Sequence, residues 1–316
     1  MNNYKELQNL IKEYEKTKIW EYLDGDDIFK LEGFDKNIYI SIMGNAKLDY
    51  GIGIYYGEQD LLSQMDISYG QYANSPDAFI RLKSYKIALG NPGNMLSPDD
   101  KTILKKNKLK ANNVVFRLDA GCLPRIIDEK ESLKIIEILK RIIEVANYVI
   151  SNEFEMDSVK PEHMFSFSKS TDKIKVKQIK WPTLKFEFIK QSKLSEDMVN
   201  KMNWVKKDVE LNIGLFYAPM FMMDTKKYPL IVLIHDEKSD LILDIIIIKE
   251  NEVNEVANKV LNSFVTKKIN PSKIIFNSNE IAYICQDIID EFEILFRLEE
   301  HLEKLFDIWI NMYESL

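Results

Sequence analysis

The sequence is poor in the residues that most often build compact catalytic or metal sites. Its 316 residues include two cysteines and three histidines. Cys122 and Cys285 lack the spacing of a metal site, and no two histidines have the paired spacing of a zinc-binding helix. We therefore expect no metal centre and no cofactor, and a reducing cytoplasm as the compartment. Cys285 falls on an apolar helical stripe, which indicates core packing.

Other common signatures are also missing. There is no Gly-x-Ser-x-Gly elbow and no Gly-Lys-Ser/Thr phosphate loop, so a hydrolase triad and a nucleotide-binding P-loop have no support. The pair Gly51 and Gly53 lies within a strand pattern, with no helix opening directly after it. This placement favours a bulge or a close-packing position over a nucleotide loop.

Long hydrophobic runs are absent as well. No stretch is long enough for a membrane helix, and the N-terminus lacks the apolar core of a signal peptide. The net charge of −7 excludes a protein that is basic as a whole. With 46% hydrophobic and 29% charged residues, the composition is that of a soluble globular protein with no membrane partner.

The first two thirds of the chain predict a mixture of helices and mostly antiparallel strands. Helical spacing is strongest over Glu131 to Ile150. Residues 91–110 contain Asn-Pro-Gly and Ser-Pro-Asp-Asp and predict a long loop with a basic run at its end. Further predicted segments are a helix near Leu7 to Tyr14 and strands at Ile38–Met43, 50–57, Phe79–Leu89, Val114–Leu118, Met164–Ser168, Ile174–Trp181 and Leu211–Phe216.

One predicted strand carries an unusual density of lysine. Lys173, Lys175 and Lys177 alternate with apolar residues, and Lys180 follows. This basic face, with Phe165, Phe167, Trp181 and Phe186 nearby, is a candidate nucleic-acid surface that contacts phosphates and stacks bases. The other interpretation is that lysines keep an exposed strand soluble and block edge pairing.

The stretch Tyr228–Phe292 organises the last third. Leu230–Ile234 and Leu241–Ile248 are unbroken apolar runs, which predict strands buried on both faces and paired as a hairpin at the centre of a sheet. The pattern then predicts a helix over 253–264, a strand at Lys273–Phe276, a helix over 281–292, a short strand at Ile294–Phe296 and a closing helix. A helix between strands of one sheet implies a right-handed parallel crossover.

This order of elements resembles a reduced ribonuclease H-like fold in which a third hairpin strand is missing. That resemblance implies acidic residues that hold divalent metals for phosphodiester hydrolysis. On this chain they would be Asp236 on the first strand, Glu252 or Glu255 on the first helix and Asp307 on the last. The strand after the helix ends in Asn277, which departs from the pattern because an amide is a poorer ligand for hard cations. Asp236 also suits a turn.

The chain as a whole resembles a family of bacterial two-domain proteins of unknown function. The resemblance lies in Trp20–Leu23 and Ile42–Gly44 in the first half, and in Tyr228–Val232 and Asn270–Ile274 in the second. It implies an N-terminal α+β region joined to a C-terminal α/β unit, and it implies no activity.

From these patterns we expect an α+β protein with domains at 1–217 and 218–316. The expected function is a non-catalytic cytoplasmic binding or interaction module, with a protein partner as one option. The alternatives are a metal-dependent phosphodiesterase in the C-terminal domain, with Asp236, Glu255 and Asp307 as candidate catalytic residues, and nucleic-acid binding through Lys173, Lys175, Lys177 and Lys180. The sequence leaves the ligand, the partner and the oligomeric state open.

Overall fold

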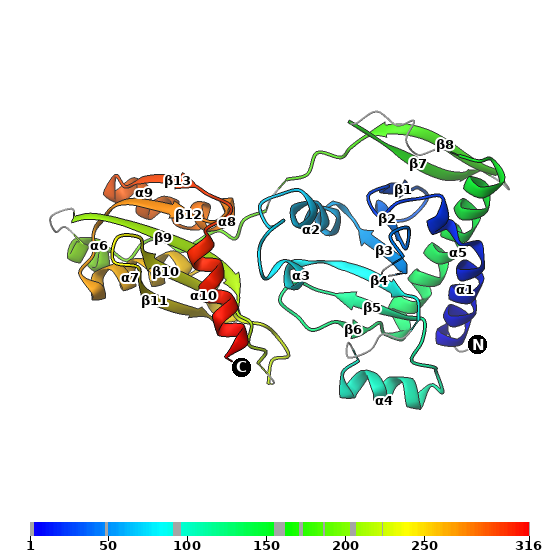
Figure 1. Cartoon of the computed structure of the whole chain (residues 1–316), viewed down its shortest axis with the longest axis horizontal. Coiled ribbons are helices and arrows are strands. Elements are labelled where there is room, and N and C mark those ends of the chain that lie inside the picture. The colour runs from blue at the N-terminus through cyan, green and yellow to red at the C-terminus, as the bar shows by residue number, and fades with distance from the viewer. Residues whose placement is uncertain are drawn as a thin grey trace. The chain divides into compact units, whose positions relative to one another are not determined.

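The computed structural model confirms an α+β protein made of two compact units (Figure 1). It describes residues 3–47, 50–90, 96–154, 162–170, 173–185, 187–202, 207–222 and 224–315. Unit 1 comprises Met1–Ser63, Lys83–Asp119 and Pro124–Lys185, and unit 2 comprises Gln64–Leu82, Ala120–Leu123 and Phe186–Leu316. Two short segments of the first half of the chain therefore belong to the unit built mainly from the last third.

Unit 1 is built on an eight-stranded sheet in the order β6-β5-β4-β3-β2-β1-β7-β8. Every neighbouring pair is antiparallel except β1 with β7, so the expected antiparallel character is confirmed. The strands are β1 (Phe29–Leu31), β2 (Ile38–Met43), β3 (Gly51–Tyr56), β4 (Ser84–Ala88), β5 (Val114–Leu118), β6 (Arg125–Ile126), β7 (His163–Ser170) and β8 (Lys173–Lys180).

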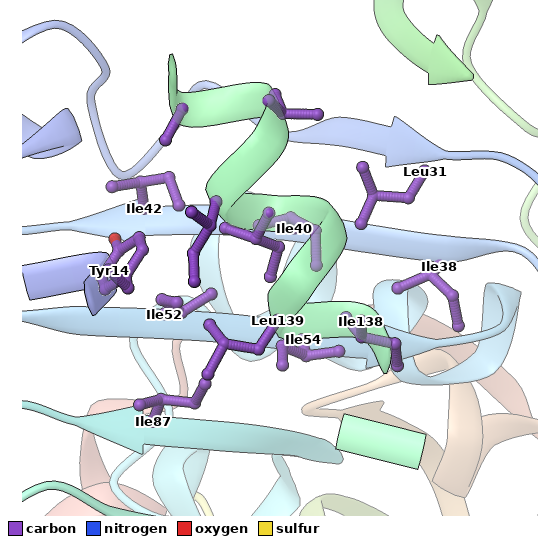
Figure 2. Close-up of a cluster of buried hydrophobic side chains, with 14 of the residues drawn as sticks. Tyr14, Leu31, Ile38, Ile40, Ile42, Ile52, Ile54, Ile87, Ile138 and Leu139 are labelled. Atoms are coloured by element: carbon purple, nitrogen blue, oxygen red, sulfur yellow. The ribbon is translucent and has the colours of Figure 1, made fainter. Parts of the chain in front are cut away.

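Two long helices, α1 (Asn3–Thr17) and α5 (Glu129–Ser151), build the core of unit 1 against one face of this sheet. Figure 2 shows alternate isoleucines of β2 and β3 pointing toward α5. Asp128 starts α5 because its side chain accepts from the Glu131 backbone N–H, while the Glu131 side chain accepts from the Asp128 N–H. The predicted helix over 131–150 is thus confirmed.

Two predictions for residues 79–110 are wrong in part. The predicted loop contains α4 (Pro98–Lys106), which Ser97 caps by accepting from the Asp100 N–H, with Pro98 at the first helical position. The stretch predicted as extended from Phe79 begins with a short helix, α3 (Ala78–Arg81), before β4. At α4 the helix-start signal of Ser97 and Pro98 was taken for a loop signal.

Unit 2 is built on a five-stranded sheet in the order β11-β10-β9-β12-β13. The strand β10 is antiparallel to β9 and β11, whereas β12 is parallel to β9 and β13. The strands are β9 (Lys207–Tyr217), β10 (Leu230–Asp236), β11 (Leu241–Ile248), β12 (Pro271–Phe276) and β13 (Leu295–Leu298).

Helices cover both faces of the unit 2 sheet. One face packs against α7 (Val256–Lys267), α8 (Asn279–Ile284) and α9 (Gln286–Phe292), and the opposite face packs against α10 (Glu303–Glu314). Cys285 is buried in the first of these cores, which confirms its expected packing role. The short helix α6 (Glu196–Met202) packs beside α7.

The position of the predicted hairpin in this sheet is wrong. The strand at the centre is β9, and β11 lies at the edge. Ile245 and Ile247 of β11 are therefore 40% and 55% exposed, although an unbroken apolar run predicted burial on both faces. The strand β9, which we predicted at Leu211–Phe216 but assigned to the N-terminal domain, supplies a third antiparallel strand beside the hairpin.

This placement of β9 bears on the expected boundary at residue 217. The strand that we assigned to the N-terminal domain hydrogen-bonds to β10 and β12 within unit 2. The division into two independently folding domains stays a prediction. Within the described ranges, no helix combines the length and the apolar character needed to cross a membrane.

Candidate functional site

A cavity of about 410 Å³ opens at one edge of the unit 2 sheet. Its walls include the last residue of β9, Tyr217, the last residue of β11, Ile248, and the first residue of β10, Leu230. The strand β9 runs parallel to β12 and β13, and β11 runs in the same direction because β9 and β11 are both antiparallel to β10. The cavity therefore lies at the side of the sheet where these parallel strands have their carboxyl ends, which we call the carboxyl edge. Open sheets with parallel strands commonly bind ligands at that edge, and small-molecule sites have volumes of this order.

The cavity has an apolar floor and a polar rim. Met222, Leu230, Ile248 and Val253 contribute the aliphatic surface. Tyr217 and Tyr228 add two aromatic rings, and the charged side chains at the rim are Asp224, Lys227, Lys249 and Glu250. Such a combination suits a ligand with an apolar body and one polar end.

Tyr217 is fixed in position by its backbone and by its neighbours. Its N–H donates to Asp77 Oδ2 over 2.7 Å, and its carbonyl accepts from Trp309 Nε1 over 2.6 Å. The side-chain hydroxyl makes no hydrogen bond to another described residue and is not enclosed. Burial of the ring raises the pKa of Tyr217 to about 12, so the hydroxyl keeps its proton at neutral pH. Among the described residues this donor has no acceptor.

Gly121 makes room for the Tyr217 ring. Its φ is +73°, and a Cβ there would lie 2.5 Å from Cε1 of Tyr217. The same residue is tied into the pocket wall, because its carbonyl accepts from the Tyr228 N–H over 2.8 Å. Glycine is therefore required both for the left-handed backbone and for the close approach of the ring.

An ion pair at the rim joins two walls of the pocket. Lys227 Nζ lies 2.5 Å from Glu250 Oε1. The side chain of Lys227 is 38% exposed and that of Glu250 is 74% exposed. The hydrogen bond to Glu250 raises the pKa of Lys227. Since Glu250 is mostly in water, the pair contributes little stability and can exchange its partners.

A buried arginine network lies directly behind Tyr217. Arg81 Nη2 contacts Asp77 Oδ2 at 2.9 Å and donates to the Leu215 carbonyl over 2.7 Å, while Nη1 contacts Glu280 Oε2 at 3.3 Å. The Asp77 side chain is fully buried. Burial alone would lower the pKa of Arg81, but the nearby charges of Asp77 and Glu280 outweigh it and raise the pKa.

Aromatic rings enclose the same guanidinium. Its central carbon lies 3.9 Å from the ring centre of Tyr72 and 5.3 Å from that of Tyr217. The Tyr72 hydroxyl donates to Glu280 Oε2 over 2.7 Å, and burial raises the pKa of Tyr72. Segment Gln64–Leu82 is thereby anchored to the carboxyl edge of β9, beside the pocket.

The predicted catalytic carboxylates do not converge. Asp236 ends β10, at the edge opposite the pocket, and accepts from the Lys238 N–H and the Ser239 hydroxyl as a turn residue. Glu255 precedes α7 and Asp307 lies on α10, and these helices cover opposite faces of the sheet. Within the described residues, no group of three or more histidine, cysteine or acidic side chains could hold a metal ion.

The ribonuclease H-like assignment placed an acidic residue on the first strand of the sheet. In the unit 2 sheet β9 precedes β10 in the chain, and Asp236 lies on β10, so the role of Asp236 in such a site stays a prediction. Asn277, at the end of β12, uses its side-chain oxygen to accept from the Leu215 N–H. The Leu215 carbonyl accepts from Arg81. The Arg81 guanidinium and the Asn277 side chain thus both bind the backbone of Leu215, so the cation near the end of β12 is supplied by the protein.

The four lysines lie on β8, an edge strand of unit 1. Lys173, Lys175, Lys177 and Lys180 are all exposed, and Lys177 pairs with Glu32 at 2.8 Å. Phe165 and Phe167 point into the hydrophobic core, so their proposed role in base stacking is wrong. Phe186 lies outside the described residues.

The pocket and the arginine network were missed at the level of sequence. Asp77 and Arg81 stand four residues apart, a spacing that indicates an ion pair on a helix. That pattern gives no sign of the remote partners, because Glu280 lies about two hundred residues further along. The predicted strand ended at Phe216, one residue before Tyr217, and only the pairing of β9 places Tyr217 at the carboxyl edge.

Comparisons with known proteins identify both halves of the chain by family models. Residues 198–313 match the model Domain of unknown function (DUF6930). No curated protein and no solved structure matches the chain significantly. Residues 4–166, just over half of the chain, match the model Domain of unknown function (DUF7309), and the chain therefore belongs to that family.

Proposed function

We propose that the protein is a non-catalytic binding module whose unit 2 holds a small molecule in the pocket at the carboxyl edge. The observation that carries the proposal is an apolar cavity of about 410 Å³ bearing a protonated tyrosine hydroxyl with no acceptor among the described residues. The hydroxyl is open to the pocket, so a ligand that carries an acceptor can take its hydrogen bond.

The composition of the pocket supports binding rather than catalysis. General acid–base and nucleophilic catalysis need a nucleophile or base held close to a partner that activates it. The described lining contains no histidine or cysteine, and its acidic residues, Asp224 and Glu250, are exposed at the rim. These groups suit orientation of a ligand.

We interpret the lysines of β8 as protection of an open sheet edge rather than as a nucleic-acid surface. Three of them, Lys173, Lys175 and Lys180, have no ion-pair partner among the described residues. Charged lysines on an edge strand oppose pairing with another chain. Phe165 and Phe167, which would have stacked bases, face the core.

A reducing compartment such as the cytoplasm fits this proposal. Neither Cys122 nor Cys285 forms a disulfide bond within the described part of the chain. Burial raises the pKa of Cys285 to about 12, which leaves it protonated and unreactive. No structural feature of unit 2 depends on oxidation of either residue.

The proposal is tested by the binding of three aromatic probes with the same body and different ends: 4-phenylbutyrate, 4-phenylbutanamide and 4-phenylbutylamine. Ligand-observed saturation-transfer NMR at millimolar concentration detects weak binding to the full chain. We expect at least one probe to bind. Tyr217→Phe removes the hydroxyl and is expected to weaken that binding by roughly 3- to 10-fold, as for one neutral hydrogen bond.

Tyr283→Phe is the matched control. Tyr283 is an exposed tyrosine of unit 2 outside the pocket lining, and its substitution should leave binding unchanged. Tyr217→Phe should not reduce the unfolding midpoint, because the hydroxyl has no hydrogen-bond partner to lose in the part of the chain that the structure describes. Failure of all three probes to bind, or equal effects of the two substitutions, would overturn the proposal.

A further inference from the structure

We infer that the pocket selects a small carboxylic acid with an apolar body, and that the ligand carboxylate replaces Glu250 as the partner of Lys227. This inference rests on the proposed function and names the chemical class of its ligand. Three features of the pocket lead to it. They are the aliphatic floor, the different exposure of the Lys227 and Glu250 side chains at the rim, and the Arg81 cation behind the Tyr217 ring.

The floor defines the body of the ligand. Leu230, Ile248 and Val253 present branched aliphatic side chains, and Met222 adds a flexible one. Such a surface gains free energy in proportion to the apolar area it buries and offers no hydrogen bonds. The body is therefore an aromatic ring or a branched hydrocarbon, and its polar group points to the rim.

At the rim, Lys227 is the less exposed of the two paired side chains. Its backbone is held in the pocket wall, because its carbonyl accepts from the Met222 N–H over 2.9 Å and its main chain forms an antiparallel β-bridge with Cys122. Its side chain is 38% exposed, against 74% for Glu250. A ligand that enters the pocket thus meets a lysine held in the wall, while Glu250 can turn out into water.

The exchange of partners costs little. An ion pair with a mostly exposed carboxylate contributes at most a small free energy, because water screens it and two long side chains must be ordered. A carboxylate on a ligand that the apolar floor already holds loses less conformational freedom on pairing with Lys227 than the exposed Glu250 side chain does. It also brings a second acceptor oxygen within the same pocket as the Tyr217 hydroxyl, which has no other described partner.

A cationic ligand fits less well. The ring of Tyr217 already has the Arg81 guanidinium 5.3 Å from its centre. A second cation on this ring would be repelled by the first instead of gaining a favourable cation–π contact. Asp224 offers little compensation, since its Oδ1 accepts from the Thr225 N–H over 2.9 Å and the residue is exposed.

The three phenylbutyl probes separate these ligand classes. Titration of the full chain by isothermal calorimetry should give the tightest binding for 4-phenylbutyrate, by roughly fivefold over 4-phenylbutanamide, with 4-phenylbutylamine weakest. Lys227→Met should remove the preference for the carboxylate. Glu250→Gln should strengthen binding of 4-phenylbutyrate, because it removes the competing carboxylate from the protein.

Lys201→Met is the matched control for Lys227→Met. Lys201 is an exposed lysine of α6 that pairs with Asp197, and its substitution should keep the order of the three probes. Equal or tighter binding of the amide or the amine would overturn this inference while leaving the proposed function standing. Weaker binding of 4-phenylbutyrate to Glu250→Gln would also overturn it. Failure of all three probes to bind would instead overturn the proposed function.

Discussion

Removal of the Arg81 side chain should loosen the carboxyl edge of unit 2. In Arg81→Met the new side chain keeps much of the aliphatic volume and loses the guanidinium. Asp77 then remains fully buried with a negative charge, and its donors among the described residues are the Ser75 hydroxyl and the Tyr217 N–H. Breaking one side of a buried ion pair costs about 3–5 kcal/mol, chiefly through the uncompensated charge that remains.

Hydrogen exchange measured by mass spectrometry is the suitable assay, because it reports the opening free energy of each segment. Arg81→Met should speed exchange in peptides from Gln64–Leu82 and from β9, and should leave peptides from α5 unchanged. Asp77→Asn added to Arg81→Met should recover part of the loss, since the second substitution removes the orphaned charge.

Arg297→Met is the control for this experiment. Arg297 pairs with Glu299 in the same unit, but the two side chains are 53% and 45% exposed. We expect a change of at most about 0.5 kcal/mol there. If Arg81→Met altered the opening free energy of Gln64–Leu82 no more than Arg297→Met does, the network would not anchor that segment. An absence of any recovery in the double variant would contradict the uncompensated-charge argument.

Three further predictions concern other parts of unit 2. Ile248→Ala should lower the free energy of unfolding, measured by chemical denaturation, by about 2–4 kcal/mol, because Ile248 is 2% exposed. Ile247→Ala should lower it by less than about 1 kcal/mol, because Ile247 is 55% exposed. Similar losses would contradict the edge position of β11. Burial raises the pKa of Asp66 from 3.8 to about 6. Protonation therefore favours the folded state, so the stability that Asp66 contributes is complete below about pH 4 and is lost as the pH rises through 6. Asp66→Asn should accordingly stabilise the protein at pH 7, by about 1 kcal/mol once solvent screening is allowed for, and have no such effect below pH 4; a pH-independent change would refute this. Asp236→Ala should lower the free energy of unfolding by about 1 kcal/mol through lost turn hydrogen bonds, equally with and without manganese. If manganese raised the wild-type unfolding midpoint and the substitution abolished that rise, the assignment of Asp236 as a turn residue would be contradicted.

The sequence pattern predicted elements whose signals are local. Helix α5 was predicted by its regular apolar spacing, and the parallel arrangement of β12 and β13 followed from the helices between strands. The edge position of β11 could not be obtained in this way. Its apolar run resembles a central strand, and only the long-range pairing of β9 with β10 and β12 shows which strand is central.

The candidate site illustrates the same limit. Gly121 lies far from Tyr217 and Lys227 in the sequence, and none of the three belongs to a motif. The requirement for glycine at position 121 arises from a ring ninety-six residues away. The helix cap at Ser97 is a different case, since the Ser-Pro-Asp-Asp sequence contains a complete helix-start signal that composition alone disguised as a loop.

The most direct test of the pocket is the methyl NMR spectrum of the full chain, recorded without a probe and with each of the three phenylbutyl probes in turn. The methyl groups of Leu230, Ile248 and Val253 line the cavity, whereas those of Ile245 and Ile247 lie outside its lining on β11. The account predicts that the first three shift together on one binding curve while the other two stay constant. An unchanged spectrum, or shifts confined to Ile245 and Ile247, would contradict the claim that unit 2 binds a small molecule at its carboxyl edge.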